Sequence, residues 1–234
     1  MNTKLDLRPS PIAGQWYSGN AKQLATNIDQ YISGADLPDI EGEIIGIIAP
    51  HAGYIYSGPV AGYAFAAVQG QNPDLVAVVS PMHQPYFEPL LTSAHDAYHT
   101  PLGAISINRA VMTQLDQDLQ ADLGIGIKGI RRDQEHSLEI ELPFLQRSVA
   151  GNFSLLPIMI RDQSVRVARA LGTILARTLS HHAPLLVAST DLSHFYPQET
   201  ARKFDQEMLR RIADFDPVAV LNAEDDNKGF ACGR

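Results

Sequence analysis

The chain has 234 residues, 45% of them hydrophobic, which is enough for one substantial core, and it contains no run of about 18 apolar residues that would suggest a membrane span. Its 18 basic and 26 acidic residues give a formal net charge of −8, which argues against a nucleic-acid or anionic-membrane partner because such partners require a basic surface. The single cysteine, Cys232, excludes an intrachain disulfide framework, and because the N-terminus lacks an apolar secretory signal we expect a cytoplasmic protein.

Short apolar runs alternate with helical patterns along the chain. This alternation predicts an α/β fold, with a mostly parallel or mixed central sheet flanked by helices. In chain order, we expect a strand at 44–49, a helix at 58–68, a strand at 75–79, a long loop up to 103, a strand at 104–107, a helix at 109–119, a helix at 137–149, a strand at 153–160, a helix at 165–179, a strand at 185–188 and a helix from 197 to about 215.

Two local features refine these expectations. The run at 44–49 is continuously apolar rather than alternating, which predicts a strand buried on both faces. Pro143 lies inside the helix expected at 137–149 and should kink that helix or move its start. No repeat, linker or low-complexity tract interrupts the pattern, so residues 1–234 are expected to form one domain.

Three of the predicted strands are followed by a histidine. These are His51, His83 and His194. Ligands of open α/β sheets bind beyond the carboxyl ends of the strands, so if the three strands are parallel neighbours their histidines gather at one edge. Imidazole is a favoured ligand of zinc, copper, iron and nickel. The pattern therefore predicts a metal site rather than three unrelated, hydrogen-bonded histidines.

The third ligand of such a site has two candidates. Asp191 would give the pattern of two histidines and one carboxylate found in non-haem iron enzymes, whereas the thiolate of Cys232 would favour softer metals. His194 would then act as a general acid or base, and Asp191 could orient it from three residues away.

Other candidate residues have structural alternatives. Glu135 or His136 could support the metal ligands, although Ser137 and Glu139 in the same segment are also explained as a helix cap and first-turn charge. Trp16 could pin the N-terminal arm or form a pocket wall, and Tyr54 could be an ordinary packing aromatic.

Several motifs together resemble the Memo family, known in prokaryotes as AmmeMemoRadiSam system protein B. The matching segments are AGQWY at 13–17, PHAGYIYSG at 50–58, SPMH at 80–83, EHSLE at 135–139, STDLSH at 189–194 and CG at 232–233. The resemblance spans nearly the whole chain, and its histidine-containing and aspartate-containing blocks are specific.

The resemblance implies a fold similar to class III extradiol ring-cleavage dioxygenases, in which two histidines and a glutamate hold iron. It implies a pocket lined by residues matching His51, His83, His194, Asp191 and Cys232. In the family, the first two histidines and the cysteine are the ligands of copper or iron. The choice of third ligand therefore moves from Asp191 to Cys232, and ring cleavage does not carry over automatically because the glutamate is replaced.

The resemblance also has implications for partners and for the extent of the chain. Residues matching Trp16 and Tyr54 lie at the pocket mouth and are implicated in phosphotyrosine-peptide binding by animal members. The name of the prokaryotic group suggests a partner from a radical-SAM system. The family normally continues beyond the cysteine, so we expect 1–234 to be a single Memo-like domain without the segment that would follow Arg234.

The leading functional hypothesis is an iron- or copper-dependent oxidoreductase that uses dioxygen on a small aromatic substrate. Its metal would bind His51, His83 and Cys232. A metal-assisted hydrolase, with zinc lowering the pKa of bound water, is a second hypothesis. A third is a non-enzymatic module that binds a ligand or phosphopeptide in the same pocket.

Overall fold

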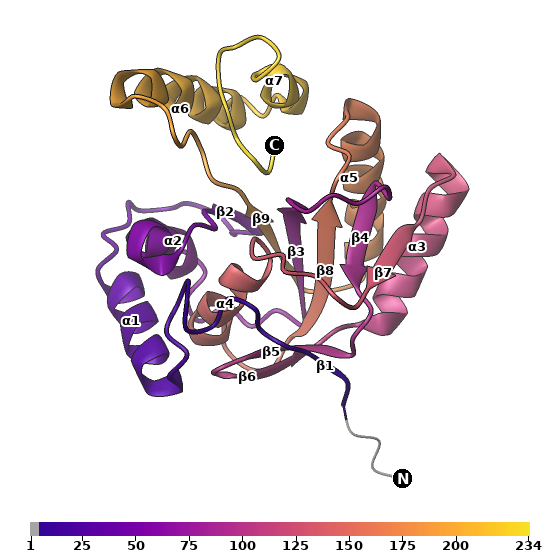
Figure 1. Cartoon of the computed structure of the whole chain (residues 1–234), viewed down its shortest axis with the longest axis horizontal. Helices are drawn as coiled ribbons and strands as arrows, with labels where there is room; N and C mark the ends of the chain where they lie inside the picture. The colour runs from indigo at the N-terminus through magenta and orange to yellow at the C-terminus, as the bar shows by residue number, and fades with distance from the viewer. Residues whose placement is uncertain (1–4) are drawn as a thin grey trace.

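A six-stranded mixed sheet forms the centre of the computed structural model, which describes residues 5–234 (Figure 1). Its strands, in spatial order, are β2 (Gly46–Ala49), β9 (Pro184–Ser189), β3 (Leu75–Pro81), β8 (Ser154–Ile160), β4 (Leu90–Ser93) and β7 (Ile127–Ile130). Neighbouring strands are parallel except β4 and β8, which are antiparallel. The predicted α/β class with a mixed central sheet is confirmed.

A smaller sheet of three strands lies beside the main one. It consists of β1 (Leu7–Arg8), β5 (Ala97–Thr100) and β6 (Gly103–Ser106), with β1 parallel and β6 antiparallel to β5. The prediction of a long loop up to residue 103 was wrong, because β4 and β5 both lie within that segment. Each of these strands is only four residues long and includes polar residues, so no clear apolar run marks it in the sequence.

Helices cover both faces of the main sheet. One face carries α1 (Ala21–Ser33), α2 (Tyr54–Ala66) and α4 (Leu142–Ser148), and the other carries α3 (Arg109–Leu123) and α5 (Val165–Leu179) (Figure 1). No element was predicted at α1, although its sequence carries the signals of a helix. Asn20 caps its first turn, and the buried side chains of Leu24, Ile28 and Ile32 are spaced four residues apart.

Strand β2 differs from its expectation in burial. Its residues alternate between exposed and buried, and Ile48 is 48% exposed. The prediction of a strand buried on both faces was wrong because, in the part of the chain that the structure describes, β2 is the edge strand of the sheet and pairs with β9 on one side. A continuous apolar run does not distinguish an edge strand from a central one.

Pro143 sets the start of α4. It occupies the first turn of the helix, where its missing N–H is not needed, and a 3-10 turn, η1 (Glu139–Glu141), precedes it. The prediction that Pro143 would move the helix start is confirmed.

Helices α6 (Gln198–Ala213) and α7 (Pro217–Asn222) stand apart from the sheet, and the chain then turns back toward it (Figure 1). This return brings Cys232 to the carboxyl end of β9, where its N–H donates to the carbonyl of Asp191. Among residues 5–234, no helix is both long and apolar enough to cross a bilayer.

Candidate metal centre

The carboxyl ends of β2, β9 and β3 form the floor of the site. These three strands are adjacent and parallel, as the strand-end argument requires. His51 lies two residues past the end of β2, and His83 lies two residues past the end of β3. The chain therefore places these two histidines at one edge of the sheet, where ligands of α/β sheets bind.

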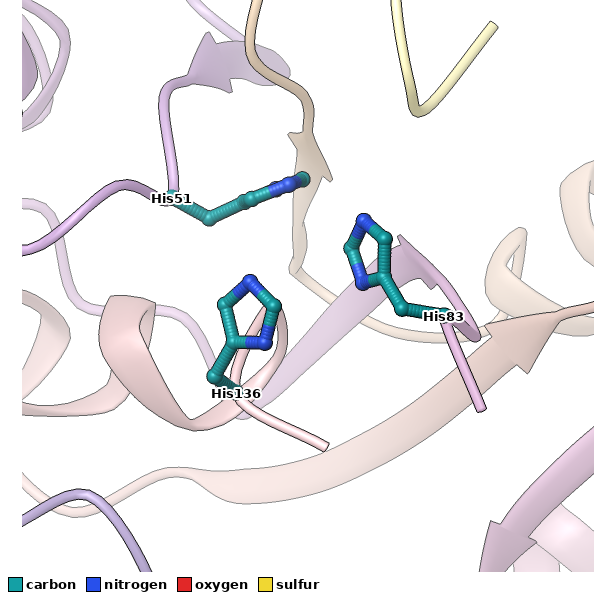
Figure 2. A group of neighbouring side chains, drawn as sticks. All are labelled: His51, His83 and His136. Atoms are coloured by element: carbon teal, nitrogen blue, oxygen red, sulfur yellow. The ribbon is translucent and has the colours of Figure 1, made fainter. Parts of the chain in front are cut away.

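The third histidine of the cluster is His136. One ring nitrogen from each of His51, His83 and His136 lies within 4.8 Å of the others. Figure 2 shows the three rings turned toward a common point, with His136 arriving from the segment that precedes η1. The sequence argument considered His136 only as a supporting residue, because nothing in its own segment shows that the loop folds over the strand ends.

His194 lies away from this cluster. It follows β9 by five residues, its side chain is exposed, and its Nδ1 is 2.8 Å from the carbonyl oxygen of Leu192. Its ring packs against Phe230 at 5.2 Å between centroids. Asp191 is at the site, but its carboxylate accepts hydrogen bonds from the backbone N–H groups of His51 and Ala52 at 2.8 and 3.2 Å. In this arrangement Asp191 positions the His51 loop.

Cys232 adds sulfur to the cluster. Its Sγ is 3.1 Å from Nε2 of His51 and accepts a hydrogen bond from the backbone N–H of Asp191 at 3.2 Å. Burial alone would raise the pKa of the thiol, but hydrogen bonds with His51 and His83 lower it to about 6. A thiol with this pKa is largely a thiolate at neutral pH, which is the form that binds metals.

Glu135 holds His83 in place. Its Oε1 is 2.9 Å from Nδ1 of His83, and its Oε2 accepts the backbone N–H of the same residue at 2.6 Å. The backbone N–H groups of His136 and Ser137 also donate to Oε1. Although burial opposes it, this set of donors lowers the pKa of Glu135 to about 2. The hydrogen bond with Cys232, followed by that with Glu135, raises the pKa of His83 to about 10.

His136 is held as a neutral imidazole. Burial lowers its pKa to about 4, because a desolvated ring disfavours the charged form. Trp16 packs on it, with 4.2 Å between ring centroids. Tyr54 lies deeper, 4% exposed, and its hydroxyl donates to the carbonyl of Ile140 at 2.8 Å. Of the two aromatic residues predicted for the pocket, Trp16 thus contacts the cluster and Tyr54 packs in the core.

His51 is the most buried of the three histidines, at 1% exposed. Its Nδ1 lies 2.9 Å from Oγ of Ser189. That hydroxyl oxygen also lies 2.8 Å from the carbonyl oxygen of Ser137 and 2.7 Å from Oε1 of Glu141. The opposite nitrogen, Nε2, faces Cys232.

A buried network ties the N-terminal arm to the segment that carries Glu135 and His136. The guanidinium of Arg8 contacts Asp133 at 2.5 Å and Glu139 at 2.6 Å, and donates to the carbonyl of Glu135 at 2.9 Å. Tyr17 donates to the same Glu139 carboxylate at 2.8 Å. These contacts fix the segment on both sides of the histidine it presents to the cluster.

A cavity of about 540 Å³ opens beside the cluster. His83 and Cys232 form part of its wall, and Arg161, Gln163 and Phe230 also line it. Its volume suits a small organic molecule.

The donor set fits a transition-metal ion. Imidazole and thiolate together suit iron, copper and zinc. Because metal–nitrogen bonds are about 2.0–2.1 Å long, two nitrogens on one ion lie at most about 4.2 Å apart. Nitrogens that lie within 4.8 Å of one another therefore need only small side-chain rotations to share an ion.

Comparison with known proteins agrees with the motifs. Residues 8–234 match the family described as "Memo-like protein". A "MEMO1 family protein" of Nitrosopumilus maritimus is 30% identical over 232 residues, covering 97% of this chain and 83% of the relative. One from Thermotoga maritima is 35% identical over 222 residues, covering 90% and 78%, and one from Methanococcoides burtonii is 32% identical over 229 residues, covering 97% and 83%.

Proposed function

The chain belongs to the Memo-like protein family, and on that premise we propose that it binds one redox-active iron or copper ion and acts as an oxidoreductase. His51, His83 and Cys232 would hold the ion, and His136 is the remaining imidazole within reach. The observation that carries the proposal is the convergence of three imidazoles and a thiol of lowered pKa at the ends of adjacent strands.

The proposed substrate is a small aromatic molecule bound in the cavity beside His83 and Cys232. A bound iron or copper ion would supply the electron transfer by which dioxygen oxidises such a molecule. Phe230 offers an aromatic surface within the cavity, and Arg161 offers a positive charge to a phenolate or carboxylate.

The residues around the ligands have separate tasks. Glu135 fixes the ring of His83 through Nδ1, which leaves Nε2 for the ion. Asp191 fixes the backbone at His51. Trp16 shields one face of His136 from water. An acid or base role for His194 stays a prediction, since its ring would have to turn from Leu192 and Phe230 to reach the cavity.

Metal content tests the proposal directly. Protein purified without oxygen should contain about one iron or copper per chain by elemental analysis, and the double variant His51→Ala with His83→Ala should contain none. The matched control is the double variant His99→Ala with His181→Ala, because both of these histidines are exposed and outside the cluster. It should keep the metal.

The other outcomes discriminate among the hypotheses. Zinc as the bound ion, with substrate turnover that needs no dioxygen, would overturn the redox assignment in favour of a hydrolase. Metal retained by the His51 and His83 double variant would overturn the ligand assignment. If no metal binds and a peptide or small ligand still enters the cavity, the site is a binding module.

A further inference from the structure

Cys232 lies in a segment that forms neither helix nor strand, residues 229–234. Its place beside the histidines therefore depends on contacts with other elements. Two backbone groups of its turn bind the end of β9. The N–H of Cys232 donates to the carbonyl of Asp191 at 3.2 Å, and the N–H of Gly233 donates to the hydroxyl of Thr190 at 2.8 Å. Because both contacts go to the same short stretch past β9, they alone would let the turn pivot about it.

Gln163 holds the turn from the opposite side. Its side-chain amide donates to the carbonyl oxygen of Cys232 at 2.7 Å. A carbonyl oxygen can only accept, so the NH₂ group of the amide must face it. Among residues 5–234, this is the only hydrogen bond that joins the backbone of residues 232–233 to an element other than the end of β9.

The loop that carries Gln163 is itself well fixed. Gln163 lies three residues past the end of β8, which is parallel to β3, so it reaches the edge of the sheet where the histidines gather. The backbone N–H groups of Arg161 and Asp162 both donate to the carbonyl of Pro89, and Ser164 caps the first turn of α5. The amide of Gln163 is thus presented from a rigid support.

Together these hydrogen bonds set the direction of the Cys232 side chain. Its N–H and its carbonyl belong to the two peptide groups that flank Cα, and each peptide group is planar. Holding both planes fixes the Cα–Cβ bond between them, and with it the approach of Sγ, which lies 3.1 Å from Nε2 of His51. Without the contact to Gln163, the second plane is free to rotate.

We infer that Gln163 is a positioning residue of the proposed metal site, which acts through the backbone of Cys232 to hold the sulfur beside the histidines. The inference rests on the proposed function for its metal, but the position of the sulfur belongs to the metal-free protein as well. The two can therefore fail separately.

The first test is the alkylation of Cys232 by iodoacetamide in metal-free protein, since this is the only cysteine of the chain. At about pH 9.5, about one unit above the ordinary pKa of cysteine, the thiol is ionised with or without its histidine contacts, so the rate follows its accessibility. Gln163→Leu should raise the rate about three- to tenfold, as expected for the loss of one hydrogen bond. Gln163→Glu should raise it too, because a carboxylate has no N–H to donate.

Gln71 provides the matched control. Its amide donates to the carbonyl of Ile44 at 3.1 Å, and its side chain is partly buried like that of Gln163. Ile44 precedes β2, at the opposite end of that strand from His51. Gln71→Leu thus loses the same kind of contact away from the cluster, and it should leave the alkylation rate unchanged.

Co²⁺ binding gives a second readout. A thiolate bound to Co²⁺ produces a charge-transfer absorption band, so one titration reports both the affinity and the bond to Cys232. Loss of a contact that supports a metal ligand typically weakens binding by about 10–100-fold, which is the effect expected for Gln163→Leu, together with a weaker band per bound ion. Gln71→Leu should keep the affinity and the band of the wild type.

Three results would overturn the inference. They are a Gln163→Leu variant with the wild-type alkylation rate, a Gln71→Leu variant that behaves like Gln163→Leu, and unchanged Co²⁺ affinity in Gln163→Leu when the wild type binds the ion. If the alkylation rates follow expectation and the wild type binds no metal, the positioning role of Gln163 stands and the proposed metal site falls.

Discussion

Glu135 and Glu141 lie on the two sides of the same histidine cluster, and their environments differ in nearly every respect. Glu135 accepts hydrogen bonds from the His83 ring and from three backbone N–H groups, and its pKa falls to about 2. Glu141 has one hydroxyl contact, its other oxygen has no partner within residues 5–234, and its pKa rises. One segment of chain therefore supplies both an anion and a neutral acid.

The difference shows how a fold sets the charge state of identical side chains. A buried carboxylate stays ionised where several donors converge on it, and it takes up a proton where they do not. At the cluster, Glu135 contacts the half-buried His83, whereas Glu141 contacts the hydroxyl of Ser189, which in turn contacts the fully buried His51. Negative charge is thus placed where solvent can still reach one of the rings.

Replacing Arg8, which contacts the segment that carries Glu135, is expected to cause the largest loss of stability. Arg8 is 2% exposed and holds Asp133 and Glu139 on either side of Glu135. Arg8→Met should lower the free energy of unfolding by about 3–5 kcal/mol, because it leaves two buried carboxylates without a counter-charge. Urea unfolding monitored by circular dichroism measures this loss.

Arg147 provides the matched control for Arg8. It makes a similar two-pronged contact with Asp29, but both side chains are largely exposed. Arg147→Met should cost no more than about 1 kcal/mol. Equal losses in the two variants would show that the buried network does not stabilise the Glu135 segment.

Replacing Glu135 itself tests whether its negative charge stabilises the fold. In Glu135→Gln, one oxygen becomes an NH₂ group that must face backbone N–H donors or the His83 ring. A loss of about 2–3 kcal/mol in the free energy of unfolding is expected near neutral pH, in line with the value of hydrogen bonds to a charged group. Urea unfolding checks it, and a loss below about 0.5 kcal/mol would mean that the carboxylate charge is not needed.

A smaller effect is expected where the cysteine loop approaches β9. A Cβ on Gly233 would press against the carbonyl of Ser189 and the side chain of Thr190, and the N–H of Gly233 donates to the Thr190 hydroxyl at 2.8 Å. Gly233→Ala should displace Cys232 and weaken metal binding by about tenfold, near 1.4 kcal/mol. Chelator competition measures this, and Gly172→Ala, at a position open to solvent, should leave affinity unchanged.

How much of this site was visible in the sequence depends on whether its residues lie at strand ends. His51 and His83 follow apolar runs directly, so local pattern and the rule for parallel sheets brought them together. His136 sits on a loop whose course is set by contacts of Glu135 and Arg8 with distant residues, which no local pattern reveals. His194 follows a strand too, but the four residues between Ser189 and His194 carry it past the edge.

The same division holds for the fold. Helix α5 and strand β8 were placed within a residue of their observed bounds, because long periodic or β-branched segments carry their own signal. The short strands β4 and β5 and the edge position of β2 were missed. Their structure depends on which neighbours they pair with, and pairing is decided by the rest of the chain.

The smallest loss of stability is expected for Glu141→Gln, and its pH dependence is the sharpest contrast with Glu135. Near pH 5 the free energy of unfolding of the variant should differ from that of the wild type by no more than about 1 kcal/mol, because an amide replaces a neutral acid of the same shape.

Burial raises the pKa of Glu141 in the folded state above its value of 4.5 in the unfolded chain. Between these two values the folded protein holds a proton that the unfolded chain lacks, so wild-type stability falls as pH rises, by up to about 1.4 kcal/mol per pH unit. Glu141→Gln lacks this dependence and should become the more stable protein with increasing pH. Urea unfolding of both proteins from pH 5 to pH 8 checks the slope; parallel curves would mean that Glu141 is ionised in the fold, as Glu135 is.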